Sequence, residues 1–147
     1  MSAKYFVLSL LLLCVGSSAL AQKQKQGIQG KVFWIEGNQM PGPDAVLTPQ
    51  EGVQREIFIY EATKVTDVSE QGGFFSNIRT KLVLKVQSEQ DGSFRVRLPP
   101  GFYSVFVMES NGLYANLFDA NNFINPVLVK PKAFAWLTIA IDYKAAY

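Results

Sequence analysis

The chain has 147 residues, of which 13% are aromatic, and it carries 14 Lys plus Arg against 12 Asp plus Glu, one cysteine and no histidine. Zinc sites are usually built from Cys and His, and Ser-His or Cys-His catalysis needs an imidazole base, so these site classes are excluded and no cofactor is expected. The cations are scattered rather than gathered into the stripe that marks a nucleic-acid surface, so no nucleic-acid partner is expected.

The first residues are expected to be an export signal. Lys4 supplies a positive charge, Tyr5–Val15 form an apolar run, and Ala19–Ala21 form a small-x-small cleavage site, which together predict a removed signal peptide over residues 1–21. No apolar run is long enough to span a membrane, so no transmembrane segment is expected. The protein is therefore expected in the periplasm or outside the cell. As an alternative, Leu11–Cys14 faintly resembles a lipoprotein cleavage box.

Cleavage would remove Cys14, the only cysteine, so the mature chain would have no disulfide. Residues 22–26 read QKQKQ and are predicted to be a short polar tail. Residues 27–147 contain no repeat and are predicted to form one domain, which is long enough to bury a sizeable core.

From Gly27 onward, short apolar runs alternate with turn residues, which is typical of a β-sandwich or barrel. No window of helical length has a 3.6-residue period. We therefore predict an all-β sandwich of seven or eight mostly antiparallel strands, with strands at 28–35, 56–61, 82–88, 93–98, 103–109, 113–117, 127–130 and 135–143.

Two connections are long. Residues 37–52 are rich in proline and glycine, and residues 62–81 form a polar segment around the adjacent Phe74 and Phe75. Two neighbouring phenylalanines in a polar loop need something to cover them. Either this segment folds back and plugs an open end of the sandwich, or it binds a partner.

The stretch DGSFRVRLPPGFYSVFV, residues 91–107, has the clearest alternation in the chain. We expect residues 93–98 and 103–109 to pair as a hairpin around 99–102, with one face in the core. The opposite face would place Arg97 beside Ser104 and Arg95 over the Phe106 ring. A three-residue loop at 90–92, with Gly92 left-handed, would join the preceding strand and complete a meander over residues 82–109.

Residues 87–107, with their Asp-Gly-x-Phe and Leu-Pro-Pro-Gly-x-Tyr motifs, resemble carboxypeptidase regulatory-like domains. The stretch GIQGKVFW, residues 27–34, resembles the opening strand of the same family. That family is similar in fold to transthyretin, so the resemblance implies a Greek-key β-sandwich without catalytic residues. It implies a non-catalytic exported module that binds a protein or glycan of the cell envelope. A carbohydrate-binding domain is the alternative.

The residues expected to contact such a partner are Phe74, Phe75, Trp136, Arg95 and Arg97. If the alternate residues of the last strand face the core, Trp136 and Asp142 point outward, where a tryptophan could stack on a sugar ring. Alternatively, Trp136 closes the edge of the sandwich.

Three further possibilities concern charged residues. The stretch LPPGFYSVFVMES also resembles collagen-binding B-type repeats of bacterial surface fibres, which implies an isopeptide bond between Lys31 and Asp142 assisted by a buried Glu109. Residues 118–125 weakly suggest a calcium loop, but with one carboxylate a turn made by Asp119 is favoured. A hydrolase with paired carboxylates is disfavoured because no acid pair stands out from solvated charge.

Overall fold

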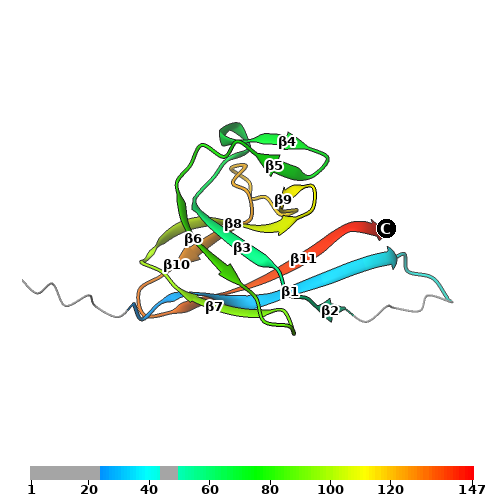
Figure 1. The fold of residues 1–147 in the computed structure, drawn as a ribbon, viewed down its shortest axis with the longest axis horizontal. Helices are drawn as coiled ribbons and strands as arrows, with labels where there is room; N and C mark the ends of the chain where they lie inside the picture. The colour runs from blue at the N-terminus through cyan, green and yellow to red at the C-terminus, as the bar shows by residue number, and fades with distance from the viewer. Residues whose placement is uncertain (1–23, 44–49) are drawn as a thin grey trace, which may run out of the picture.

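The structure is a computed structural model that describes residues 24–43 and 50–147, so the predicted signal peptide, its cleavage site and part of the 37–52 connection lie outside the described residues. The described chain is almost entirely β-structure (Figure 1). Its elements in order are β1 (Gly27–Asn38), β2 (Glu51–Gly52), β3 (Glu56–Glu61), the 3-10 turn η1 (Val65–Asp67), β4 (Ser69–Gln71), β5 (Phe74–Ser76), β6 (Leu82–Gln87), β7 (Ser93–Arg97), β8 (Gly101–Glu109), β9 (Gly112–Tyr114), β10 (Pro126–Val129) and β11 (Phe134–Ala146).

The strands form two sheets. Sheet A has the order β11-β1-β2, with β7 also paired to β1, and sheet B has the order β4-β5-β9-β8-β3-β6, with β10 also paired to β8. The β1–β11 pair is parallel, and the other pairs are antiparallel. Figure 1 shows β1 and β11 as two long strands that run side by side, with strands of sheet B lying across them. The predicted all-β sandwich is confirmed, and each of the eight predicted strands has a counterpart.

The main core lies between the sheets. The strands β1, β7 and β11 of sheet A turn their apolar side inward, whereas β3 and β8 bury side chains on both sides of sheet B. Ile28 and Val32 of β1 and Ile141 of β11 are fully buried there. Glycine at position 30 keeps β1 and β11 close, since a Cβ at Gly30 would lie 1.7 Å from the carbonyl oxygen of Leu137.

The predicted hairpin of residues 93–109 is wrong. β7 pairs with β1 in sheet A, whereas β8 pairs with β3, β9 and β10 in sheet B. The alternation was compatible with both arrangements, because strands that face each other across a core bury the same alternate residues as strands that lie side by side. The six inward residues do share one core, namely Phe94, Val96, Leu98, Tyr103, Val105 and Val107.

The predicted meander is wrong for the same reason, since β6 pairs with β3 and not with β7. The predicted three-residue loop before β7 is present: the Glu89 amide donates to the Ser93 carbonyl at 2.8 Å, and Gly92 is left-handed with φ of 87°. A Cβ at Gly92 would lie 2.2 Å from the Val32 carbonyl oxygen, so the turn requires glycine.

The segment from residue 62 to residue 81 forms an edge of sheet B and contributes side chains to both sides of that sheet. It contains η1 and the β4–β5 hairpin, and β5 extends sheet B by pairing with β9. Together with the strands beneath, it forms a second hydrophobic cluster whose buried members are Phe58, Phe75, Phe106, Leu113, Ala115 and Ile124. Phe106 is fully buried in this cluster, so the predicted contact between Arg95 and Phe106 is wrong.

Candidate functional site

One side of sheet A faces away from the main core and carries aromatic and cationic side chains; we call it the outer face. Neighbouring positions of β1, β7 and β11 place these side chains together, because Gln29 is aligned with both Arg95 and Trp136, and Lys31 is aligned with both Ser93 and Thr138. The outer face comprises Gln29, Lys31, Phe33, Ser93, Arg95, Arg97, Phe134, Trp136 and Thr138.

The side chain of Arg95 spans the outer face. Its guanidinium carbon lies 3.8 Å from the centre of the Phe134 ring, and its Nη1 donates to Oε1 of Gln29 at 3.3 Å. Because β7 and β11 lie on opposite sides of β1, Arg95 reaches over β1 to make this contact. Arg95 and Phe134 therefore hold each other in place on the surface.

Trp136 is the most open aromatic ring of the outer face. Its side of β11 faces solvent, and the residue is 65% exposed. The indole Nε1 donates to Oγ1 of Thr138 at 3.1 Å, which restrains the ring while leaving it uncovered. The outward orientation expected from the alternation of β11 is therefore observed, and Trp136 does not close the edge of the sandwich.

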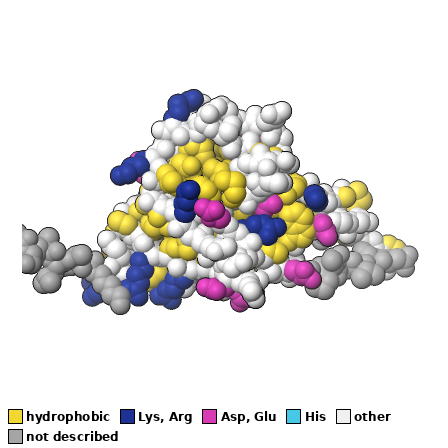
Figure 2. Space-filling model, in the orientation of Figure 1, with side chains coloured by type: hydrophobic (Ala, Val, Ile, Leu, Met, Phe, Trp, Pro, Cys, Tyr) yellow, Lys and Arg dark blue, Asp and Glu magenta, His cyan; other side chains and the backbone are white. Residues whose placement is uncertain are grey.

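The paired segments of the outer face, residues 27–33, 93–97 and 134–140, contain Lys31, Arg95 and Arg97 and no Asp or Glu. Figure 2 shows Lys and Arg side chains gathered at the end of the molecule where β7 and the start of β1 lie. The acid next to this region is Asp91, whose pKa is lowered mainly by hydrogen bonds from Ser93 and also by the charge of Lys31. The paired segments of the outer face therefore carry a net positive charge, which favours anionic partners.

Phe74 and Phe75 do not belong to the outer face. Phe75 is 3% exposed, and its ring packs against Phe106 with 5.6 Å between ring centres. Phe74 is half-buried against the rings of Tyr114 and Tyr143, at 5.6 and 5.1 Å. Both side chains therefore pack the 62–81 segment against the rest of the protein, Phe74 next to the main core and Phe75 in the second cluster.

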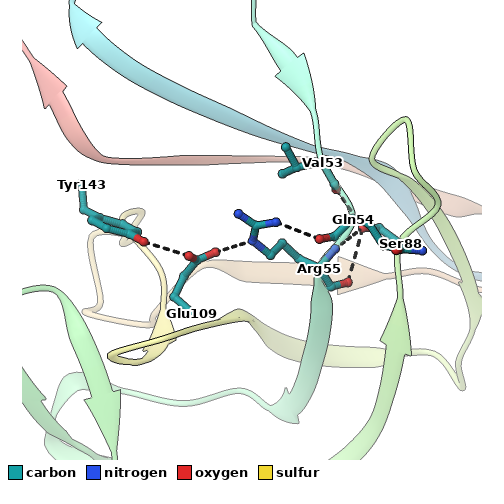
Figure 3. A network of polar contacts seen from close by, with 6 residues as sticks. All are labelled: Val53, Gln54, Arg55, Ser88, Glu109 and Tyr143. Atoms are coloured by element: carbon teal, nitrogen blue, oxygen red, sulfur yellow. Dashed lines mark hydrogen bonds and ion pairs between the residues drawn. The ribbon is translucent and has the colours of Figure 1, made fainter.

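Glu109 lies in a network that joins β3, β8 and β11 (Figure 3). Its side chain is 6% exposed and accepts hydrogen bonds from Nε of Arg55 and from the hydroxyl of Tyr143, both at 2.8 Å. Nη1 of Arg55 also donates to the carbonyl of Gln54 at 2.9 Å. The hydroxyl of Ser88 accepts from the Arg55 amide at 2.8 Å and so fixes the start of β3.

Asp142 is held in a second set of hydrogen bonds. It accepts from the hydroxyls of Tyr114 and Tyr147, at 2.6 and 2.7 Å, and from Nδ2 of Asn116 at 2.8 Å. Burial works to raise the pKa of Asp142, but these three donors outweigh it and the pKa is lowered. Burial, and then the hydrogen bond to Asp142, raise the pKa of Tyr114 well above its usual value.

The outward orientation expected for Asp142 is wrong. The register between β1 and β11 shifts between the Trp34–Ile141 and Glu36–Lys144 pairs, which marks a bulge at this point of β11. A bulge re-aims the side chains beside it. Both Asp142 and Tyr143 consequently reach partners in sheet B, as their hydrogen bonds to Tyr114 and Glu109 show.

The structure does not bring together the residues of the isopeptide hypothesis. Lys31 lies on the outer face beside Thr138, and its Nζ is 5.4 Å from the centre of the Phe33 ring. Thr138 precedes Asp142 by four positions, which corresponds to roughly 13 Å along a strand. Lys31 and Asp142 are thus too far apart to react, and Glu109 is engaged by Arg55 instead.

The sequence offered no motif for the residues around Glu109. These residues come from four separate parts of the chain, namely Trp34 from β1, Arg55 from just before β3, Tyr114 from β9 and Tyr143 from β11. No local spacing links them. The ring of Tyr143 contacts Trp34 at 5.4 Å and Tyr114 at 5.2 Å between centres. The available signal was the high proportion of aromatic residues near strand ends, which does not identify contacts.

Two hollows occur away from the outer face. One, of about 500 Å³, is lined in part by Glu61, Lys81 and Tyr103, and another, of about 420 Å³, lies beside Phe74 and Asn111. Neither includes Glu109 or Asp142. These hollows therefore do not coincide with the two hydrogen-bonded carboxylates.

The loop at residues 118–125 is a turn organised by Asp119. Its Oδ1 accepts from the amides of Asn121 and Phe123, both at 2.9 Å. This is the favoured Asx arrangement, and the carboxylate oxygen is occupied by backbone donors.

Across residues 24–43 and 50–147, no cluster of three or more His, Cys, Asp or Glu residues is arranged to hold a metal ion. The same residues include no helix with the length and apolar character to cross a bilayer. No protein-family model, curated protein or solved structure matches the chain. The resemblance to carboxypeptidase regulatory-like domains stays a prediction from the sequence.

Proposed function

We propose that this chain is a non-catalytic, exported binding module that holds a protein or glycan of the cell envelope against the outer face of sheet A. The observation that carries the proposal is Trp136, a large ring that is 65% exposed and restrained by Thr138. A restrained, open aromatic ring offers contact area at little entropic cost, which is a frequent property of binding surfaces. The N-terminal sequence supports export.

The chemistry of the two hydrogen-bonded carboxylates supports binding over catalysis. A glycosidase needs one carboxyl with a raised pKa as general acid. The pKa of Asp142 is lowered, and Glu109 already accepts from Arg55 and Tyr143. Both acids therefore act as acceptors that join β11 to sheet B.

A carbohydrate partner is the second candidate, favoured by the surroundings of Trp136. Gln29 lies beside it on β1 and Thr138 follows on the same side of β11. An open ring next to amide and hydroxyl groups can stack on a sugar and hydrogen-bond its hydroxyls.

The proposal is tested with Trp136→Ala and with the control Leu128→Ala, which removes a 54%-exposed side chain from sheet B. Binding of each variant to separated protein and polysaccharide fractions of the envelope is measured by biolayer interferometry. We expect Trp136→Ala to weaken binding at least about tenfold, as for a central aromatic contact. Leu128→Ala should bind like the wild type, and both melting temperatures should stay close to that of the wild type.

Equal binding by Trp136→Ala and the wild type would show that the outer face is not the binding surface. Loss of binding in Leu128→Ala alone would place the surface on sheet B. Either result would refute the proposal.

A further inference from the structure

We propose that the outer face binds an acidic polysaccharide, with one sugar ring on Trp136 and sugar carboxylates on Arg95, Arg97 and Lys31. This inference rests on the proposed function and names the chemistry of the partner.

The two arginines of the outer face are not paired with an acid. The segments that build this face contain no Asp or Glu, and the side chains of Arg97 and Lys31 make no hydrogen bond or ion pair with any residue in ranges 24–43 and 50–147; the nearest acid is Asp91, whose pKa the charge of Lys31 helps to lower. Arg95 and Arg97 are exposed on the same side of β7. Uncompensated arginines on a fixed strand attract anions, and their planar groups bind carboxylates with two parallel hydrogen bonds.

Arg95 is already positioned for such a contact. Its guanidinium lies on the Phe134 ring, and its Nη1 is held by Gln29. A carboxylate that meets Arg95 therefore does not have to order a flexible side chain first, which lowers the cost of binding.

The partner is expected to be a polymer because the contacts are spread over three strands. Arg97 lies on β7 and Trp136 lies on β11, with β1 between the two strands. Strands are spaced about 4.8 Å apart, so the backbones of Arg97 and Trp136 are separated by roughly 10 Å or more. Neighbouring sugars of one chain can contact both side chains.

The aromatic rings favour a polysaccharide over a single-stranded nucleic acid. Nucleic-acid platforms stack successive bases on successive uncovered rings. Here Arg95 covers Phe134, and Nζ of Lys31 lies over Phe33, at 5.4 Å from the ring centre. Trp136 is therefore the one widely exposed ring among the described residues of the outer face, which suits one stacked sugar flanked by charge contacts.

The experiment uses three acidic polysaccharides, namely polygalacturonate, alginate and hyaluronate, each beside its neutral carboxyl-reduced form. The variants are Arg97→Gln and Trp136→Ala. The control Lys85→Gln removes one positive charge from β6 in sheet B, where Lys85 is half-exposed beside Glu56. All dissociation constants are measured by isothermal titration calorimetry at low and high salt.

We expect at least one acidic polymer to bind and its neutral form to bind at least about tenfold more weakly. Arg97→Gln should weaken binding about tenfold, as expected for a lost charge-assisted contact, while Lys85→Gln should leave it within about twofold. Binding should also weaken as salt rises, because exposed charges are screened. Trp136→Ala should weaken binding of the acidic polymer at both salt concentrations.

Equal binding of acidic and neutral forms, with loss in Trp136→Ala, would overturn this inference and keep the proposed function. Capture of an envelope protein through Trp136, with no binding of any acidic polymer, would likewise overturn this inference and keep the proposed function. Tighter binding of an oligothymidylate than of every polysaccharide would overturn it in favour of a nucleic-acid surface. If nothing binds in a way that depends on Trp136, both this inference and the proposed function are refuted.

Discussion

Replacing Phe75 with alanine should strongly destabilise the protein. Phe75 is 3% exposed and packs on Phe106, which is fully buried. Truncating a buried phenylalanine to alanine costs about 3–5 kcal/mol, because the transfer free energy is lost and a cavity remains. We expect a value near the lower end, about 3 kcal/mol, since Phe118 at the margin of the cavity is exposed and can move to fill it.

The loss is measurable by thermal and urea unfolding followed by circular dichroism. For a domain of this size, each kcal/mol shifts the melting temperature by roughly 3–5 °C, so Phe75→Ala should melt about 10–15 °C below the wild type. Phe118→Ala is the matched control, because that ring contacts Phe75 but is 52% exposed. It should cost at most about 1 kcal/mol.

A melting temperature of Phe75→Ala within about 2 °C of the wild type would refute this reasoning. It would mean that the 62–81 segment does not contribute to the core and that Phe75 is available to a partner. If the reasoning holds, the folded fraction of Phe75→Ala should still bind through Trp136, since the outer face belongs to the other sheet.

Three other changes test the packing and the hydrogen-bond networks. Gly30→Ala places a methyl group 1.7 Å from the Leu137 carbonyl oxygen, so it should cost about 3 kcal/mol or more in urea unfolding; an unchanged midpoint would contradict the close β1–β11 contact. Glu109→Leu leaves Arg55 without its acid and should cost about 2–3 kcal/mol, whereas Glu109→Gln, which keeps an acceptor, should cost less; equal losses would show that the retained acceptor does not help to hold Arg55. Burial and then the hydrogen bond to a carboxylate raise the pKa of Tyr114 above its usual 10.0, so the folded state keeps a proton that the unfolded state releases. This contribution to stability is complete below about pH 10 and falls as pH rises further, so the free energy of unfolding of Tyr114→Phe should fall less steeply above about pH 10 than that of the wild type; identical slopes would contradict the raised pKa.

The strands could be predicted because apolar runs, alternating with polar residues in β7 and continuous in β3, are bounded by turn residues, and this is a local property. β3 was predicted with its observed bounds, and the loop before β7 followed from Gly92. The pairing of β7 could not be predicted, since residues 93–98 bury the same side chains against either neighbour. The choice depends on β1, whose residues Gly27–Lys31 align with Arg97–Ser93 from far away in the sequence.

The candidate site was predictable in part for the same reason. Trp136 and Arg95 were expected on outward positions, and the structure places them there. The sequence did not show that they lie on the same surface, where both are aligned with Gln29 of β1. The stacking of Arg95 on Phe134 depends on β7 and β11 sharing β1 as a neighbour, which no local pattern contains. Asp142 was misplaced because a bulge interrupts the two-residue period on which its orientation was argued.

The arrangement of the two clusters also explains why the outer face can be tested without unfolding the protein. The main core lies on the inner side of sheet A, and the second cluster and both carboxylate networks lie on or next to sheet B. Arg97 and Trp136 belong to neither cluster, so their loss removes little buried apolar area. Phe134 is different, because it is half-buried and holds Arg95. Substitutions at Arg97 and Trp136 therefore report on binding, whereas a substitution at Phe134 would change binding and local order together.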